Sequence, residues 1–317
     1  MAQGGKHNVN RPSIPIEKAV RSTFSIAARG LVAVALALSA AGAAIAQEDA
    51  KPTKRKIRAA DGLELVCETR GKGETTLVFL HGWCGDRDYW KNQVDEFAAD
   101  YRIVALDQAG HGESGKSRAK WTIAGLAEDV EATVKALGIK RGILVGHSMS
   151  GPIALAAAKR MPGTVVAVIG ADTLQNVEAK PPEEFAKQIR DGFAADFKGF
   201  MTSGFEGLLG AKVDPEVKKR LLARSLANDP KMAVPLMADL QGLDQKTLLK
   251  EAKVPVRCIN SGGGFQFFTP TDVAVNRKYA DYDAALIPDV GHYPMLEKPA
   301  EFNAKLRETL KGLGAKK

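Results

Sequence analysis

A serine and a histidine that could act as a nucleophile and its base stand at the ends of two separate apolar runs. Ser148 lies in the segment GHSMSG, residues 146–151, between the apolar run RGILVGHS and the helical stretch GPIALAAAKR. A serine on a sharp turn between strand and helix projects its hydroxyl above the sheet, and small residues two positions away on each side allow that turn. Gly146 and Ser150 meet this need. The spacing therefore predicts Ser148 as a nucleophile.

The histidine follows Gly291, after the apolar run AALIPDV and just before the closing helical stretch. A histidine in the loop beyond the last strand can reach a serine at the strand crossover and remove its proton. His292 has this placement and is the predicted base. His7, His111 and His147 lack it and are predicted to be structural.

Two backbone N–H groups could stabilise the oxyanion that such chemistry forms. The segment HGWCG, residues 81–85, directly follows the apolar run TTLVFL. An N–H just past this strand can act together with the N–H of the residue after the nucleophile. Trp83 and Met149 are the predicted donors, through their main chains. The Trp83 side chain is also expected as an aromatic wall of a pocket.

The elements that must position these residues alternate between short apolar runs and longer helical periods. The expected strands are KIRAADGLELVCETRG (a hairpin), TTLVFLHG, YRIVALD, RGILVGHS, VVAVIGADT, VPVRCINS and AALIPDV. The stretches 88–100, 122–138, 151–163 and 297–314 have helical patterns. Near-continuous apolar strands alternating with helices are typical of an α/β fold with an open, doubly wound, mostly parallel sheet.

A long helical insertion interrupts this alternation. Residues 176–250 have helical patterns only, and a segment of that length is too long for a loop of a compact domain. We expect a helical cap at 176–250, inserted into a core formed by residues 56–175 and 251–317.

The N-terminal residues resemble an export signal. Residues 1–29 hold five basic side chains and one acid and lead into the uncharged run at 30–46, which ends in Ala44-Ile45-Ala46. This pattern predicts a signal peptide at 1–46, cleaved after Ala46, then a basic leader at 47–55 and a periplasmic or secreted protein. A retained membrane anchor is the alternative, but the run is short for a span of about 20 residues. We expect no stable membrane span after cleavage.

The formal net charge of +8 is concentrated near the N-terminus. No basic stripe with interleaved aromatic residues follows, so a nucleic-acid partner is not expected. The three cysteines, Cys67, Cys84 and Cys258, are an odd number for an exported chain, so at least one is free or pairs between chains. The sequence leaves the disulfide state and the oligomeric state open.

Four segments together resemble the α/β-hydrolase superfamily: HGWCG, DQAGHGES, GHSMSG and DVGHYPMLEKPAEF. The resemblance covers residues 56–174 and 252–315. It implies a serine nucleophile, a histidine base and an orienting acid that act on a small-molecule acyl substrate. The sequence has no HExxH string, no paired cysteine spacing, no calcium-loop string of acids and no dinucleotide fingerprint, so no metal or cofactor is expected. Serine at position 148 sets the chain apart from the haloalkane dehalogenase and epoxide hydrolase branches, which have aspartate there. Hydrolysis of a carboxylic ester or related acyl bond is the expected reaction.

The acid departs from the superfamily pattern. Relatives usually carry an aspartate soon after the penultimate strand, but here VPVRCINS leads into Gly262-Gly263-Gly264, and Asp272 is the first acid beyond. Asp172, at the end of VVAVIGADT, is the preferred substitute, because some dehalogenase-like members take their acid from that strand. Asp272 is the alternative.

Other functions remain as alternatives. If the acid is absent altogether, the chain is a catalytically impaired ligand-binding protein, since losing the orienting acid costs on the order of 10⁴-fold in rate. C–C hydrolases, lactonases and cofactor-free haloperoxidases share the same catalytic outline. The string GHGESGKS at 110–117 matches the phosphate-binding loop of nucleotide hydrolases, but that site requires a helix opening at Lys116, and the helical pattern starts near Thr122.

Overall fold

The computed structural model describes residues 1, 4–5, 51–263 and 270–317. Apart from residues 1, 4 and 5, the predicted signal peptide lies outside the described residues, as do residues 47–50 of the leader. All helices and strands described below belong to the compact unit Ala50–Lys317. None of the helices in the described residues has the length and apolar character needed to cross a bilayer.

One eight-stranded sheet with the order β1-β2-β4-β3-β5-β6-β7-β8 forms the centre of this unit. Strands β1 and β2 pair antiparallel, as do β2 and β4, and all remaining pairs are parallel. The strands are β1 (Thr53–Arg58), β2 (Glu64–Arg70), β3 (Thr76–Leu80), β4 (Arg102–Asp107), β5 (Gly142–His147), β6 (Val165–Ala171), β7 (Val256–Ser261) and β8 (Tyr282–Ile287).

Helices cover both faces of the sheet, which explains why its central strands are buried throughout. Every residue of β3 and β5 is buried. The helices α3 (Ile123–Ala136), α4 (Ser150–Arg160) and α9 (Gln245–Ala252) form one packed group, and η1 (Arg87–Trp90), α2 (Lys91–Phe97), α11 (Pro294–Glu297) and α12 (Pro299–Gly312) form another. Right-handed crossovers in opposite directions along the sheet place these groups on opposite faces. The expected doubly wound α/β fold is confirmed.

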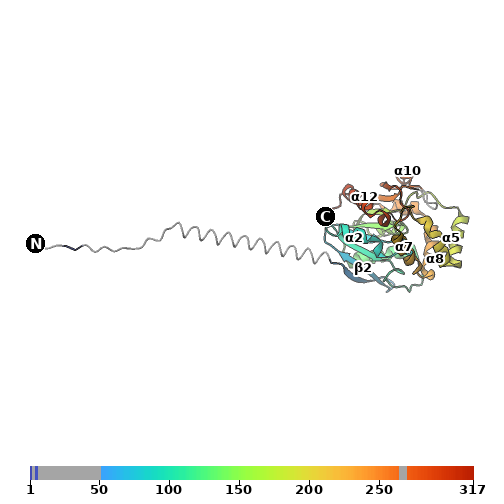
Figure 1. Cartoon of the computed structure of the whole chain (residues 1–317), viewed down its shortest axis with the longest axis horizontal. Helices are drawn as coiled ribbons and strands as arrows, with labels where there is room; N and C mark the ends of the chain where they lie inside the picture. Colours follow the sequence, from blue (N-terminus) through green and yellow to red (C-terminus); the bar gives the residue numbers. More distant parts are fainter. Residues whose placement is uncertain (2–3, 6–50, 264–269) are drawn as a thin grey trace. The chain divides into compact units, whose positions relative to one another are not determined.

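Five helices lie between β6 and α9: α5 (Glu183–Ala195), α6 (Phe197–Gly204), η2 (Phe205–Leu208), α7 (Pro215–Leu226) and α8 (Pro230–Gly242). Figure 1 shows α5 and α8 together at one end of the unit, and the two helices pack against each other. Asp196, Asp214 and Asp229 cap the N-termini of α6, α7 and α8. Such caps satisfy backbone N–H groups that lack an intrahelical partner.

Two boundaries differ from the sequence expectation. Strand β1 begins at Thr53, inside the expected leader, because Thr53–Arg55 continue the pairing with β2. Helix α9 packs against α4 on the sheet, and Lys159 of α4 forms an ion pair with Glu251, although residues up to 250 were assigned to the cap. The helical pattern alone does not reveal which layer a helix joins.

Candidate active site

Ser148 occupies a tight turn between β5 and α4. Its φ is +53°, in the left-handed region that most side chains avoid. A Cβ atom added to Gly146 would lie 2.4 Å from the carbonyl oxygen of Ser150, so only glycine fits there. The backbone N–H of Ser148 donates to the carbonyl oxygen of Ala171 on the neighbouring strand, at 3.1 Å. The turn therefore holds the hydroxyl-bearing residue at the carboxyl edge of the sheet.

His292 contacts both predicted partners. Its Nε2 lies 2.7 Å from Oγ of Ser148, and its Nδ1 lies 2.6 Å from Oδ2 of Asp172. A carboxylate only accepts hydrogen bonds, so the proton on the ring is on Nδ1, and Nε2 is free to accept from the serine hydroxyl. The imidazole is buried and excluded from most solvent. This arrangement can make the hydroxyl of Ser148 nucleophilic.

Asp172, and not Asp272, is the acid beside the histidine. Asp172 directly follows β6, and its φ of +46° turns the carboxylate toward the loop after β8. Its second oxygen, Oδ1, accepts the N–H of Ser261 at 2.9 Å. Asp272 instead caps the short helix α10 (Val273–Asn276), where Oδ1 accepts the N–H of Val275.

The loop after β3 lies directly against Ser148. A Cβ atom added to Gly82 would lie 3.2 Å from Cβ of Ser148 and 2.5 Å from Nδ1 of His147. Neither the N–H of Trp83 nor that of Met149 has a hydrogen-bond partner among the described residues. Both groups can therefore donate to an oxygen atom bound next to Ser148.

Ser150 stands at the fifth position of the motif, where glycine is usual. It connects the start of α4 to the loop after β3 by hydrogen bonds. Its hydroxyl donates to the carbonyl oxygen of His81 at 2.5 Å. The amide of Gln108 donates to the same carbonyl at 2.7 Å and to the Ser150 hydroxyl at 3.1 Å. The start of α4 and the loop after β3 thus share one buried polar cluster.

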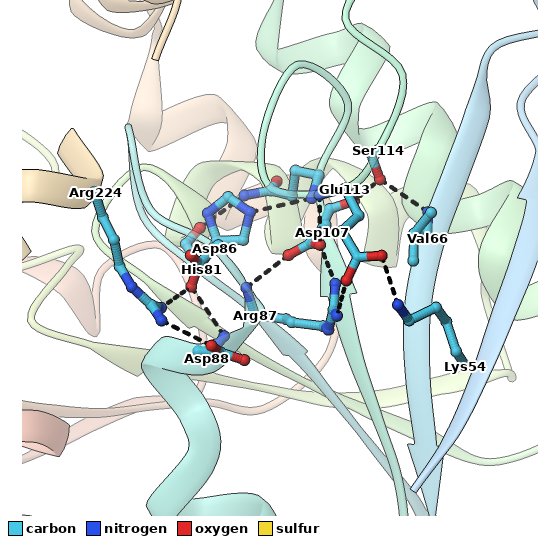
Figure 2. A network of polar contacts seen from close by, with 11 residues as sticks. Lys54, Val66, His81, Asp86, Arg87, Asp88, Asp107, Glu113, Ser114 and Arg224 are labelled. Carbon is cyan, nitrogen blue, oxygen red and sulfur yellow. Dashed lines mark hydrogen bonds and ion pairs between the residues drawn. The ribbon is translucent and has the colours of Figure 1, made fainter. Parts of the chain in front are cut away.

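Residues of the cap also form hydrogen bonds with the loop after β3. Asn228 donates to the carbonyl oxygen of Cys84 at 3.0 Å, and the indole of Trp83 donates to the carbonyl oxygen of Ala233 at 2.9 Å. Figure 2 shows the guanidinium of Arg224, from α7, beside the carboxylates of Asp86 and Asp88.

The network in Figure 2 also includes a buried carboxylate, that of Asp107. Arg87 pairs with Asp107 at the end of β4 and with Glu113, and Glu113 pairs with Lys54 of β1. Burial of Asp107 makes its pairing with Arg87 the most enclosed contact of this chain of charges. These contacts link the cap, the loop after β3 and the edge of the sheet.

His147 makes a structural contact with the segment that carries His292. Its Nε2 lies 2.7 Å from the carbonyl oxygen of His292, so the neutral ring donates there. Burial holds the pKa of His147 well below its ordinary value and lowers the pKa of His81 to about 4. Both rings are therefore neutral at physiological pH. Only the position of His147, adjacent to Ser148, could have indicated this contact.

Aromatic side chains from the cap pack around Trp83. The ring centroids of Phe193 and Phe197 lie 4.9 and 6.1 Å from that of Trp83, both in edge-to-face geometry. Phe193 also contacts Phe200 at 4.7 Å. These contacts place an apolar aromatic cluster beside the loop after β3.

The nucleotide-binding alternative requires a helix that does not form. The residues from Lys116 to Thr122 are a loop, and α3 begins at Ile123. Within the string, the hydroxyl of Ser114 donates to the carbonyl oxygen of Asp107 at 2.5 Å, which folds the segment into a turn against β4. No helix N-terminus therefore opens at Lys116, where its backbone N–H groups could bind a phosphate.

Comparison with known proteins agrees with this architecture. A family model described as alpha/beta hydrolase fold matches residues 75–236, about half of the chain. A dihydrolipoyllysine-residue acetyltransferase component of the acetoin cleaving system from Cupriavidus necator is 27% identical, over 80% of this chain and 68% of that protein.

Two esterases are also similar. A pimeloyl-[acyl-carrier protein] methyl ester esterase from Nitrosospira multiformis is 25% identical over 77% of this chain and 97% of its own length. The solved structure of a thermophilic esterase from Thermogutta terrifontis has a TM-score of 0.69 and 25% identity, and the match covers 82% of this chain and 99% of that one. With the sheet order, the serine turn and the family match together, the chain belongs to the α/β-hydrolase fold family and is an enzyme of that type.

Proposed function

We propose that this protein is a serine hydrolase that cleaves a carboxylic ester or a related acyl bond through an acyl-serine intermediate. The observation that carries the proposal is the contact of one imidazole with two partners, 2.7 Å to Oγ of Ser148 and 2.6 Å to the carboxylate of Asp172. Hydrogen-bonded nucleophile, base and orienting acid are what acyl transfer to water requires. The similarity to esterases supports the same reaction class.

In the proposed mechanism, Oγ of Ser148 attacks the acyl carbon while Nε2 of His292 takes the hydroxyl proton. Asp172 stabilises the imidazolium that forms and keeps Nδ1 protonated. The N–H groups of Trp83 and Met149 donate to the oxyanion of the tetrahedral intermediate. His292 then protonates the leaving alcohol, and the acyl-serine remains. A water molecule, deprotonated by the same imidazole, hydrolyses the acyl-serine and regenerates the enzyme.

Replacing Ser148 by alanine tests this proposal. Hydrolysis of short p-nitrophenyl esters by Ser148→Ala is expected to fall by on the order of 10⁶-fold in kcat, because no nucleophile remains. Ser117→Ala is a matched control, since Ser117 is an exposed serine in the loop before α3. A fluorophosphonate probe should label the wild type and the control and leave Ser148→Ala unlabelled. Wild-type turnover by Ser148→Ala would refute the proposal.

The ligand-binding alternative rests on a missing orienting acid, and the contact between the carboxylate of Asp172 and His292 supports a hydrolase instead. Lactonase, C–C hydrolase and haloperoxidase activities use the same three side chains. A panel of ester chain lengths and lactones, assayed with the wild type and with Ser148→Ala, separates esterase from lactonase activity by their relative kcat/KM.

We also propose that residues 1–46 are removed on export and that the enzyme acts in the periplasm or outside the cell. The basic start, the apolar run and Ala44-Ile45-Ala46 support this location. N-terminal sequencing of the protein from cell fractions should give Gln47 as the first residue. A full-length chain in the membrane fraction would favour the retained anchor.

A further inference from the structure

Glu297 contacts the backbone on both sides of the proposed catalytic base. Its Oε2 accepts the N–H of Gly291 at 2.9 Å, and its Oε1 accepts the N–H of Tyr293 at 3.2 Å. These two residues flank His292. The carboxylate thus holds the short segment from which the imidazole projects, without contacting the reacting atoms.

The same carboxylate also reaches the cap. Oε2 of Glu297 accepts the N–H of Gly210, at 2.9 Å, from the segment that follows η2. The N–H of His292 in turn donates to the carbonyl oxygen of Leu208 at 2.7 Å. The cap segment 208–210 and the histidine segment 291–293 are therefore joined by a direct backbone hydrogen bond and by the shared carboxylate.

The two segments approach each other closely at two glycines. A Cβ atom added to Gly291 would lie 2.4 Å from the backbone nitrogen of Gly210 and 2.5 Å from the carbonyl oxygen of Leu208, so the backbone leaves no room for a side chain there. A Cβ atom added to Gly210 would lie 2.6 Å from Oε2 of Glu297 and 3.0 Å from the backbone nitrogen of Gly291. A side chain at position 210 would therefore displace the carboxylate of Glu297.

Three partners therefore hold the backbone around His292: the carboxylate of Glu297, the carbonyl oxygen of Leu208 and the imidazole of His147. The imidazole must stay within hydrogen-bond reach of both Ser148 and Asp172 while it transfers protons. A displacement of about 1 Å in a reacting group can lower a rate by up to roughly 100-fold. The support around His292 is therefore expected to influence the catalytic rate itself.

We propose that Glu297 is a positioning residue for His292 and that, through Gly210, it makes the placement of the imidazole depend on the docked cap. This proposal rests on the proposed function of Ser148 and His292. An ionised carboxylate suits the role because it only accepts hydrogen bonds and can receive several backbone N–H groups at once. A glutamine at this position would aim its amide N–H₂ at backbone donors and lose at least one of the three contacts.

The first test is Glu297→Gln, assayed on a short p-nitrophenyl ester. We expect kcat to fall by about 10- to 100-fold with KM nearly unchanged, because the base is displaced while the acyl site stays intact. Glu301→Gln is the matched control: within the described part of the chain, Glu301, in the first turn of α12, forms only a partly exposed ion pair with Lys298. The endpoint of fluorophosphonate labelling counts the folded sites in each preparation, so a loss of folded protein is not mistaken for a loss of rate.

The second test approaches the same contact from the cap. Gly210→Ala pushes a methyl group against Glu297 and the backbone of Gly291 and should reproduce the fall in kcat. Gly204→Ala is its matched control, because a Cβ atom at Gly204, also in the cap, meets nothing within 4 Å. We expect Gly204→Ala to keep wild-type kcat and KM.

The outcomes are distinguishable. Wild-type kcat for both Glu297→Gln and Gly210→Ala, with Ser148→Ala inactive, would overturn the positioning role and leave the proposed function standing. A rise in KM at unchanged kcat would also overturn it, because that pattern belongs to substrate binding. If Ser148→Ala keeps full activity, the proposed function itself fails. A drop in melting temperature without a change in kcat at 25 °C would assign Glu297 to stability alone and reject the proposal.

Discussion

At the scale of single residues, the acid departs most from the usual pattern of the family. Asp172 follows β6 and Ser148 follows β5, and the last residues of these strands, His147 and Ala171, are paired in register. Both residues also have positive φ values, so both side chains leave the sheet edge from the same kind of turn. The proposed acid therefore comes from the strand beside the proposed nucleophile, and Ser261, near the usual position of the acid, contributes a backbone N–H instead.

Replacing the two candidate acids separately should rank them clearly. Asp172→Asn is expected to lower kcat for p-nitrophenyl esters by about 10⁴-fold, because the neutral amide stabilises the wrong histidine tautomer and no longer balances the imidazolium. Asp272→Asn should leave kcat unchanged, since asparagine can still cap α10 and the loss of a cap costs only about 1 kcal/mol of stability. Steady-state kinetics of the two purified variants measure the ranking. A larger loss in Asp272→Asn would reverse the assignment.

At the scale of elements, the attachment of α7 to the loop after β3 is electrostatic. Asp86 caps η1 and faces Arg224 of the cap, with Asp88 and Asp107 nearby. Burial raises the pKa of Asp86 to about 6, against the lowering influence of Arg224. The carboxyl group therefore binds its proton more tightly in the folded protein than in the unfolded chain, where an aspartate titrates near pH 3.9.

This shift makes a prediction about stability and pH. The contribution of Asp86 is fully present below about pH 4 and is lost as the pH rises through about 6, because the folded state then has to hold a partly buried charge. The loss is at most about 3 kcal/mol, and contact with solvent reduces it. In urea unfolding at pH 4 and pH 7.5, Asp86→Asn should gain stability relative to the wild type as the pH rises. Asp88→Asn, which alters the more exposed partner of Arg224, should not show this gain.

The sequence predicts the elements better than it predicts how they contact one another. The buried strands β3 to β6 appear as apolar runs, and the serine turn is visible from Gly146 and Ser150 around Ser148. The layer that α9 joins, the hydrogen bond from His147 to His292 and the contacts of Glu297 with Gly210 all join residues far apart in the chain. Such pairings depend on tertiary packing, which a local pattern of residue types does not encode.

At the scale of the whole molecule, the three cysteines are distributed through the core and none is paired. Cys67 lies on β2, Cys84 follows β3 and Cys258 lies on β7, and all three are buried free thiols. Burial raises the pKa of Cys67 and of Cys258 to about 12 and also raises that of Cys84. Because the thiolate is the reactive form, these thiols are expected to be inert in the folded protein.

Titration with Ellman's reagent at pH 8 checks this expectation. The native enzyme should release no thionitrobenzoate over minutes, and the protein in guanidinium chloride should release an amount equivalent to all three cysteines of the sequence. Omitting reductant from the purification should not alter the melting temperature. Fewer than three reactive thiols in denaturant would reveal a disulfide, and a fast-reacting thiol in the native state would contradict the burial.

The sheet positions Ser148 and Asp172, whereas the segment that carries His292 also contacts the cap, and this difference limits how the enzyme could be re-engineered. Hydrogen bonding between β5 and β6 sets the separation of Ser148 and Asp172, so a foreign cap grafted between β6 and α9 would leave that pair in register. A foreign cap could displace the imidazole of His292, because residues 208–210 of the cap hydrogen-bond to the backbone of His292 and to Glu297. A chimera designed for a new substrate range should therefore retain residues 208–210. Without them, we expect a lower kcat together with the altered specificity.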